Sequence, residues 1–133
     1  MAVEPLLVVD AANVVGSRPD GWWRDRAGAT ARLRDRLAPI ARQGLPGLAA
    51  PVQVVLVVEG AARRLEPAEG IRVVAAERSG DDAVVGLVEA EGTGRRCVVV
   101  TADRALRDRV TALGAEVRGP RWLTAPPDRV PET

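Results

Sequence analysis

Short runs of apolar, mostly β-branched residues recur along the chain and predict five strands. The runs span residues 6–9, 52–58, 71–75, 97–100 and 116–118. All but the last are apolar at nearly every position, which is typical of strands buried on both faces of a parallel sheet. The run at 116–118 carries a charged residue at each end and is the weakest of the five.

Apolar residues at helical spacing separate these strands. They predict helices over about 25–37, 81–91 and 102–113. In the last of these, Leu106, Val110 and Leu113 share one face, and Gly114 stands at the position of a C-terminal cap. The connection 60–70 gives only a doubtful helix. Strands alternating with helices predict right-handed βαβ units and a three-layer α/β domain with a mostly parallel sheet of about five strands.

The length predicts one domain over residues 1–123, followed by a Pro-rich C-terminal tail over 124–133. Four prolines fall within the 14 residues from Pro120 to the end of the chain. That density predicts neither a helix nor a central strand in this segment. We expect Trp122 and Leu123 to dock the start of the segment onto the domain.

The absence of His and Lys limits the chemistry that the chain can carry. The 133 residues include one cysteine, Cys97, no His and no Lys, so all 19 basic residues are Arg. This excludes triads that use His, Schiff-base and P-loop lysines, and cysteine-based zinc sites. Acid–base or metal chemistry therefore falls to Asp and Glu. Because 18 acidic residues leave a net charge of +1, contact with nucleic acid would need a local group of Arg side chains.

The N-terminal region has no pattern of a targeting or membrane segment. The apolar run 6–9 follows no basic stretch and is too short to span a bilayer. A single Cys97 within an apolar run fits a reducing compartment. We therefore expect a cytoplasmic protein without membrane contact, and leave open whether it is a monomer or a homodimer.

Acidic residues stand where several predicted strands end. Asp10 follows the first strand, Glu59 the second, and Asp81, Asp82 and Asp103 open the helices beside the third and fourth. Carboxyl ends of parallel strands meet at one edge of the sheet, so these carboxylates should converge. Carboxylates in proximity repel each other, and Mg²⁺ or Mn²⁺ would remove the repulsion. Taken singly, Asp81 and Asp103 also suit helix caps, and Glu59 suits a turn.

Three short motifs at these strand ends resemble those of the NYN domains, which are PIN-like metal-dependent ribonucleases. Residues 10–15, DAANVV, are similar to their opening D-x-x-N motif. Residues 80–84, GDDAV, resemble their second acidic motif, and residues 101–104, TADR, resemble their third. The resemblance spans about residues 5 to 123 and is strongest to the bacterial branch that holds small stand-alone endoribonucleases.

This resemblance implies a Rossmann-like sheet of order 3-2-1-4-5, flanked by helices, with an acidic pocket for Mg²⁺ or Mn²⁺. It also implies hydrolysis of RNA phosphodiester bonds. The implied metal ligands, direct or through water, are Asp10, Asp81 and Asp103, with Asp82 as an alternative or additional ligand. Spacing alone does not decide between Asp81 and Asp82, which lie about 100° apart on a helix.

Asn13 and Thr101 belong to the same motifs. The resemblance implies that Asn13 orients Asp10 or contacts a phosphate, and we place Thr101 among the predicted phosphate contacts. The chain departs from the family at a fourth acid, since Val85 and Arg107 stand where relatives often carry one. Either Glu59 supplies that carboxylate, or the site binds a single ion, or activity is low.

The segment after the first strand combines aromatic and basic residues near Asp10. Residues 16–26 read GSRPDGWWRDR. Trp and Arg planes stack on bases, at about 1–3 kcal/mol per stacked base, and Arg forks bind phosphate. An alternative is that one Trp packs the loop and the Arg residues pair with Asp20 and Asp25. The predicted RNA contacts here and after Asp103 are Arg18, Trp22, Trp23, Arg24, Arg26, Arg104 and Arg107.

Two functions stay open on the sequence. One is a metal-dependent endoribonuclease acting on RNA. The other is a non-catalytic RNA-binding or ribosome-associated module that keeps the fold with a weakened site. Three other α/β classes are excluded: a phospho-receiver domain needs a Lys, a haloacid-dehalogenase-type phosphatase needs an acid where Ala12 stands, and a dinucleotide-binding module needs a glycine fingerprint that residues 10–16 lack.

Overall fold

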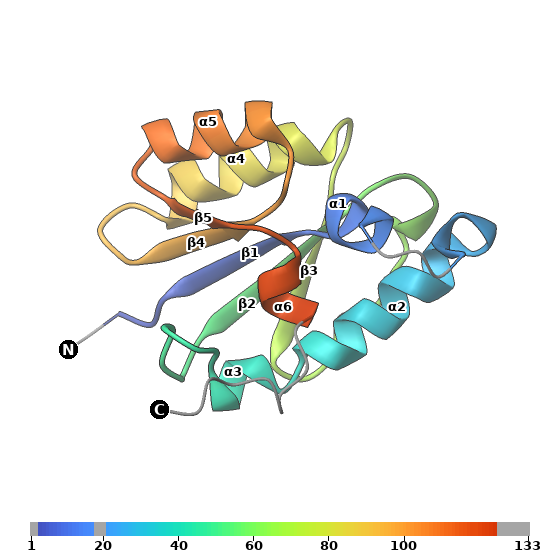
Figure 1. Ribbon diagram of the computed structural model, residues 1–133, viewed down its shortest axis with the longest axis horizontal. Coiled ribbons are helices and arrows are strands. Elements are labelled where there is room, and N and C mark those ends of the chain that lie inside the picture. The colour runs from blue at the N-terminus through green and yellow to red at the C-terminus, as the bar shows by residue number, and fades with distance from the viewer. Residues whose placement is uncertain (1–2, 18–20, 125–133) are drawn as a thin grey trace.

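Five parallel strands form one sheet in the order β3-β2-β1-β4-β5, so the first strand lies at its centre (Figure 1). The computed structural model describes residues 3–17 and 21–124. The strands are β1 Leu6–Asp10, β2 Gln53–Val58, β3 Ile71–Ala75, β4 Cys97–Val100 and β5 Glu116–Arg118. The α/β class, the parallel sheet and its strand order are confirmed.

Helices cover both faces of the sheet and complete the three layers (Figure 1). On one face lie α4 Gly80–Glu91 and α5 Arg104–Ala112. On the other lie α1 Ala11–Gly16, α2 Arg26–Leu37, α3 Ile40–Gln43 and α6 Arg121–Thr124. Two short 3₁₀ helices, η1 Trp22–Arg24 and η2 Gly60–Ala62, lie in connections. The doubtful helix at 60–70 is thus reduced to η2.

Strand β1 is buried because it is paired on both edges and covered on both faces. Its residues 6–9 are 0% exposed. Leu7 and Val9 pack into the core beneath α1 and α2, whereas Leu6 and Val8 pack into the core beneath α4 and α5. Since the next residue is Asp10, a carboxylate stands where the buried central strand reaches the edge of the sheet.

Side-chain caps fix where three of the helices begin. Asp25, Ser79 and Asp103 each accept a hydrogen bond from the backbone N–H three residues later, at 2.9, 3.2 and 2.9 Å. Such caps stabilise a helix start by about 0.5–2 kcal/mol. The cap at Ser79 sets the phase of α4 and so decides which way its first-turn acids, Asp81 and Asp82, point.

The segment after Pro120 differs from its prediction, because α6 is a helix. Proline is tolerated where a helix begins, since the N–H it lacks needs no helical partner there, and Pro120 directly precedes α6. Trp122 and Leu123 pack against the core as expected. Residues 125–133 lie outside the described part of the chain, so the predicted domain boundary stays a prediction.

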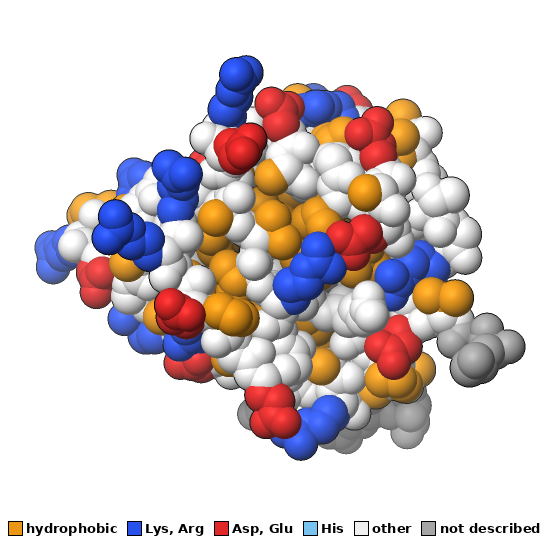
Figure 2. Space-filling model, turned by 180° about the vertical axis from the view of Figure 1, so that it is seen from behind, with side chains coloured by type: hydrophobic (Ala, Val, Ile, Leu, Met, Phe, Trp, Pro, Cys, Tyr) orange, Lys and Arg blue, Asp and Glu red, His pale blue; other side chains and the backbone are white. Residues whose placement is uncertain are grey.

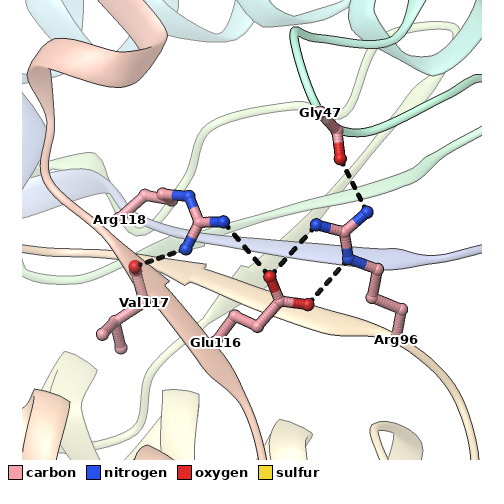
Figure 3. A network of polar contacts seen from close by, with 5 residues as sticks. All are labelled: Gly47, Arg96, Glu116, Val117 and Arg118. Atoms are coloured by element: carbon pink, nitrogen blue, oxygen red, sulfur yellow. Dashed lines mark hydrogen bonds and ion pairs between the residues drawn. The ribbon is translucent and has the colours of Figure 1, made fainter.

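Arginines tie strand starts together at the edge of the sheet opposite the acids (Figure 3). Arg96 precedes β4 and binds the Glu116 carboxylate through two nitrogens, at 2.7 and 3.0 Å, and the Gly47 carbonyl at 2.6 Å. Arg118 reaches the same carboxylate at 3.2 Å. These contacts with Arg96, and then Arg118, lower the pKa of Glu116. This part of the basic charge therefore serves the fold.

Figure 2 shows the face behind that of Figure 1, where apolar side chains gather at the centre and charged ones surround them. Basic and acidic side chains are mixed there, so this face of the described structure offers no broad patch of one sign. Among the described helices, none has the length and apolar character needed to cross a bilayer.

Candidate active site at the carboxyl edge of the sheet

Asp10 is a buried carboxylate at the end of the central strand. It is 5% exposed, and its Oδ2 accepts a hydrogen bond from the Thr101 hydroxyl at 3.0 Å. Burial raises the pKa of Asp10 from 3.8 to about 6. The Thr101 hydroxyl and the Asn13 backbone N–H oppose this rise, whereas Asp81 and Glu59 add to it. The site therefore holds a carboxyl group that is unusually ready to take up a proton or to bind a cation.

Thr101 links the ends of two neighbouring strands instead of facing solvent. It is 0% exposed, and its hydroxyl both donates to Asp10 and accepts from the Asp103 backbone N–H at 3.1 Å. Because the hydroxyl is buried between the Asp10 carboxylate and the Asp103 backbone N–H, it holds both groups in position. The side chain has no exposed surface to offer a ligand, so the geometry does not favour the predicted phosphate contact, which stays a prediction.

Asn13 fastens α1 to the loop that precedes α5. Its Oδ1 accepts a hydrogen bond from the Ala102 backbone N–H at 2.8 Å, and the residue is half-buried. Together with Thr101, it therefore holds the ends of β1 and β4 in a fixed relation. Because this side-chain contact is with Ala102 and not with Asp10, both roles predicted for Asn13 stay predictions.

The structure separates Asp81 from Asp82. Asp81 is half-buried, and its pKa is raised by burial first and then by Asp103 and Glu59. Asp82 is exposed and forms an ion pair with Arg109 of α5, at 3.1 Å. Asp81 thus joins the acidic group, whereas Asp82 points toward α5 and its predicted role as a ligand is not supported by its position.

Asp103 has two roles at once. Its Oδ1 caps α5 by accepting the Leu106 backbone N–H at 2.9 Å. Its charge also raises the pKa of Asp81, so the two carboxylates lie within each other's field. The sequence left open whether Asp103 was a helix cap or part of a site. In the structure Asp103 caps α5 and also lies close to the Asp81 carboxylate.

Glu59 connects the end of β2 to the start of α4, a contact that sequence reasoning missed. Its Oε2 accepts a hydrogen bond from the Gly80 backbone N–H. A Cβ at position 80 would collide with the Glu59 carboxylate and would lie 3.9 Å from Oδ1 of Asp10. A side chain at this position would therefore displace the Glu59 carboxylate from the Gly80 N–H. The one available signal was Gly80 itself, standing between a cap residue and two acids.

These acids provide the oxygen donors that Mg²⁺ or Mn²⁺ prefers. Within residues 3–17 and 21–124, however, no group of three or more acidic, His or Cys side chains is arranged to hold one ion. The predicted ligand set of Asp10, Asp81 and Asp103 is thus brought into one neighbourhood without forming a closed metal cage. Mg²⁺ commonly binds through one or two carboxylates, with water and substrate phosphate completing its shell, and Asp10 with Asp81 fits that pattern.

The predicted RNA contacts fall on two sides of the acids. Trp23 in η1 is 58% exposed, and the Arg24 guanidinium lies 5.9 Å from the centre of its ring. On α5, Arg104 is exposed and Arg107 half-buried. Arg26 begins α2 and is exposed. Trp22 belongs to η1, and Arg18 lies outside the described residues.

Comparison with known proteins supports the fold. No protein-family model matches the sequence, and no curated protein is detectably similar to it. The crystal structure of Rae1 (YacP) from Bacillus subtilis is similar to this chain with a TM-score of 0.71 and 19% identity, covering 90% of this chain and 71% of that chain. A mutant of the same protein matches with a TM-score of 0.68 and 20% identity over the same shares. At this identity, the likeness shows a shared fold.

The raised pKa of Asp10 predicts a pH-dependent penalty in stability. Between pH 3.8 and about 6 the folded state holds a proton that the unfolded state has lost, so ionisation at higher pH destabilises the fold. In EDTA, the free energy of unfolding of Asp10→Asn, taken relative to that of the parent, should rise by about 1–3 kcal/mol from pH 4 to pH 7.5. Urea unfolding at both pH values measures this. Asp108→Asn, at an exposed position on α5, is the control and should show no such trend; an equal trend in both variants would refute the assignment to Asp10.

The double role of Asp103 can be separated by two substitutions. Asn caps a helix about as well as Asp, so Asp103→Asn should leave the free energy of unfolding nearly unchanged, whereas Asp103→Ala should lower it by about 0.5–2 kcal/mol. Denaturant unfolding at pH 7.5 provides the comparison. Equal losses in the two variants would mean that Asp103 does not act as a cap.

Proposed function

We propose that the protein is a metal-dependent endoribonuclease that hydrolyses RNA phosphodiester bonds at the carboxyl edge of its sheet. The observation that carries this proposal is the crowding of Asp10, Asp81, Asp103 and Glu59 around a buried strand end, with the pKa values of Asp10 and Asp81 raised. Mutual repulsion of this kind is unfavourable for the fold and is common where carboxylates serve chemistry. The NYN-like motifs at the same residues support it.

In this proposal Asp10 and Asp81 would hold Mg²⁺ or Mn²⁺. When bound, the ion would supply Lewis-acid chemistry for the hydrolysis of a phosphodiester. The Thr101 hydroxyl keeps Asp10 in one orientation, and the Glu59–Gly80 contact keeps the first turn of α4, which carries Asp81, against the end of β2. Asp103 adds negative charge next to Asp81, and this charge would favour the binding of a cation.

The side chains proposed to grip RNA flank the acids. The exposed Trp23 offers a ring for stacking on an unpaired base, and Arg24 beside it offers charge to the backbone. Arg104 and Arg107 on α5 would contact phosphates on the other side. Because the net charge is only +1, binding would be confined to this edge. The substrate would be cytoplasmic RNA, either free or ribosome-bound.

A second candidate, a non-catalytic RNA-binding module, is favoured by one observation. The described residues contain no arrangement of three ligating side chains around a common point. A chain of this kind would keep the RNA-gripping surface without supporting hydrolysis. Cleavage and binding must therefore be measured separately.

The nuclease proposal predicts a sharp difference between neighbouring acids. Purified protein is incubated with single-stranded RNA, structured RNA and DNA of matched sequence, with Mn²⁺, Mg²⁺ or EDTA, and the products are resolved on gels. We expect RNA cleavage that requires the metal and that falls by about 10–100-fold or more in Asp10→Asn and Asp81→Asn. Asp82→Asn, one residue further along α4, is the matched control and should cleave within about threefold of the parent, because Asp82 pairs with Arg109.

Cleavage that persists in EDTA or in Asp10→Asn would refute the metal mechanism. Absence of cleavage with every ion, combined with RNA binding by fluorescence anisotropy, would establish the binding module instead. The melting temperature of each variant, compared with that of the parent, distinguishes a loss of cleavage from a loss of folded protein.

The stacking role of Trp23 predicts weaker RNA binding after its removal. Since one stacked base contributes about 1–3 kcal/mol, Trp23→Ala should raise the Kd for single-stranded RNA by roughly 5–150-fold. Leu113→Ala is the control, because Leu113 is also a large exposed apolar residue, at 43%, but ends α5 away from the loop. Fluorescence anisotropy in EDTA measures both, and equal Kd values for Trp23→Ala and the parent would remove Trp23 from the interface.

A further inference from the structure

A small cavity lies next to the acidic group, on the face of the sheet covered by α1 and α2. Its volume is about 140 Å³. It is enclosed by the first turns of α1, by α2 and by the turn after β2, with walls formed by Ala11, Ala12, Val15, Arg26, Glu59 and Ala62. Ala11 directly follows Asp10, and Glu59 raises the pKa of Asp10. A ligand in this cavity would therefore sit immediately beside the proposed reaction centre.

The walls of the cavity suit a flat, apolar-faced group of limited size. Three of its side chains are alanines, which leave room close to the backbone, and Val15 adds an apolar surface. Ligand sites for bases combine apolar or aromatic walls with few polar groups that read an edge. The volume is on the scale of one nucleobase and leaves little room for the attached ribose, which would stay outside.

Glu59 lines the cavity and carries the only carboxylate among the described residues that line it. Because its Oε2 already accepts the Gly80 N–H, the orientation of the carboxylate is set before a ligand arrives, which lowers the entropy lost on binding. A carboxylate accepts hydrogen bonds and donates none. On its Watson–Crick edge, guanine offers two adjacent donors, N1–H and the 2-amino group. Adenine, cytosine and uracil have no such pair of adjacent donors on that edge, because an acceptor lies next to each donor there.

We propose that this cavity is a subsite for an unpaired guanine of the RNA substrate, with Glu59 as the residue that selects it. The inference rests on the proposed action on RNA and adds a base preference to it. A guanine held between Ala12 and Ala62 directs its own sugar and phosphate toward the mouth of the cavity, next to Asp10. The subsite thus determines which phosphate of a single strand meets the acids.

Nucleoside binding in EDTA tests the subsite without any cleavage. Protein with ¹³C-labelled alanine methyl groups is titrated with guanosine, inosine and adenosine, and the methyl signals of Ala11, Ala12 and Ala62 are followed by NMR. Guanosine should shift these signals saturably. Inosine lacks the 2-amino group and should bind about 3–10-fold more weakly, as expected for one hydrogen bond, and adenosine should bind more weakly still.

Three variants sharpen the result. Ala12→Leu fills the cavity from an exposed helical position and should abolish guanosine binding, whereas Ala90→Leu, an equally exposed alanine at the end of α4, should bind as the parent does. Glu59→Gln keeps an oxygen for the Gly80 N–H but replaces the other with a donor, so it should lose the preference for guanosine over inosine.

Guanosine that causes no saturable shift, equal binding of the three nucleosides, or unchanged guanosine binding by Ala12→Leu would each overturn the subsite. Failure here is distinct from failure of the proposed function. A protein that cleaves RNA without binding guanosine keeps the nuclease proposal and loses the subsite. A protein that binds guanosine but cleaves nothing keeps the subsite within an RNA-binding module.

Discussion

The burial of one carboxylate, that of Asp10, is the constraint around which the carboxyl edge of this molecule is built. The apolar central strand carries the residue to the rim of the core, where it is 5% exposed and its pKa is raised to about 6. The Thr101 hydroxyl provides a hydrogen bond, and Gly80 provides the space that a side chain would fill. An apolar residue at the end of β1 would need neither arrangement.

Acidic and basic residues are nearly equal in number over the whole chain, but the two edges of the sheet use them differently. Carboxylates gather at the carboxyl ends of β1, β2 and β4, whereas at the opposite edge Arg96 binds Glu116 and Arg95 binds the Glu4 carbonyl and the Gln53 side chain. These arginines, far from forming a surface for nucleic acid, hold strand starts together. In the proposed function, the cations that would meet an RNA are those of η1 and α5, which flank the acids. If the proposed function holds, a near-neutral protein would in this way present a metal and a polyanion with one edge of its sheet.

The strands, their parallel sheet and the acids at its edge could be predicted from the residues, because buried parallel strands and their polar ends leave a strong local pattern. The strand order was implied by the resemblance to the NYN domains. Other features depend on contacts between distant residues. Asp81 and Asp82 could not be told apart without the phase of α4, since one residue turns the helix by about 100°. The hydroxyl of Thr101 looked available for phosphate, and only its partner 91 positions away shows that it is buried. The contact between Glu59 and Gly80 joins residues 21 positions apart and has no local pattern.

The position of the first strand in the middle of the sheet also has a consequence for the order in which the molecule matures. β1 is synthesised first, yet one of its neighbours is β4, and the contact of Asp10 with Thr101 closes a loop of most of the chain. Contacts over such separations form late, because the entropy of closing the loop must be overcome before they are made. A chain still being synthesised thus contains Asp10, Glu59 and Asp81 while Thr101 and Asp103 are absent. The acidic site therefore lacks its Thr101 contact and the Asp103 carboxylate until β4 and the start of α5 have been synthesised.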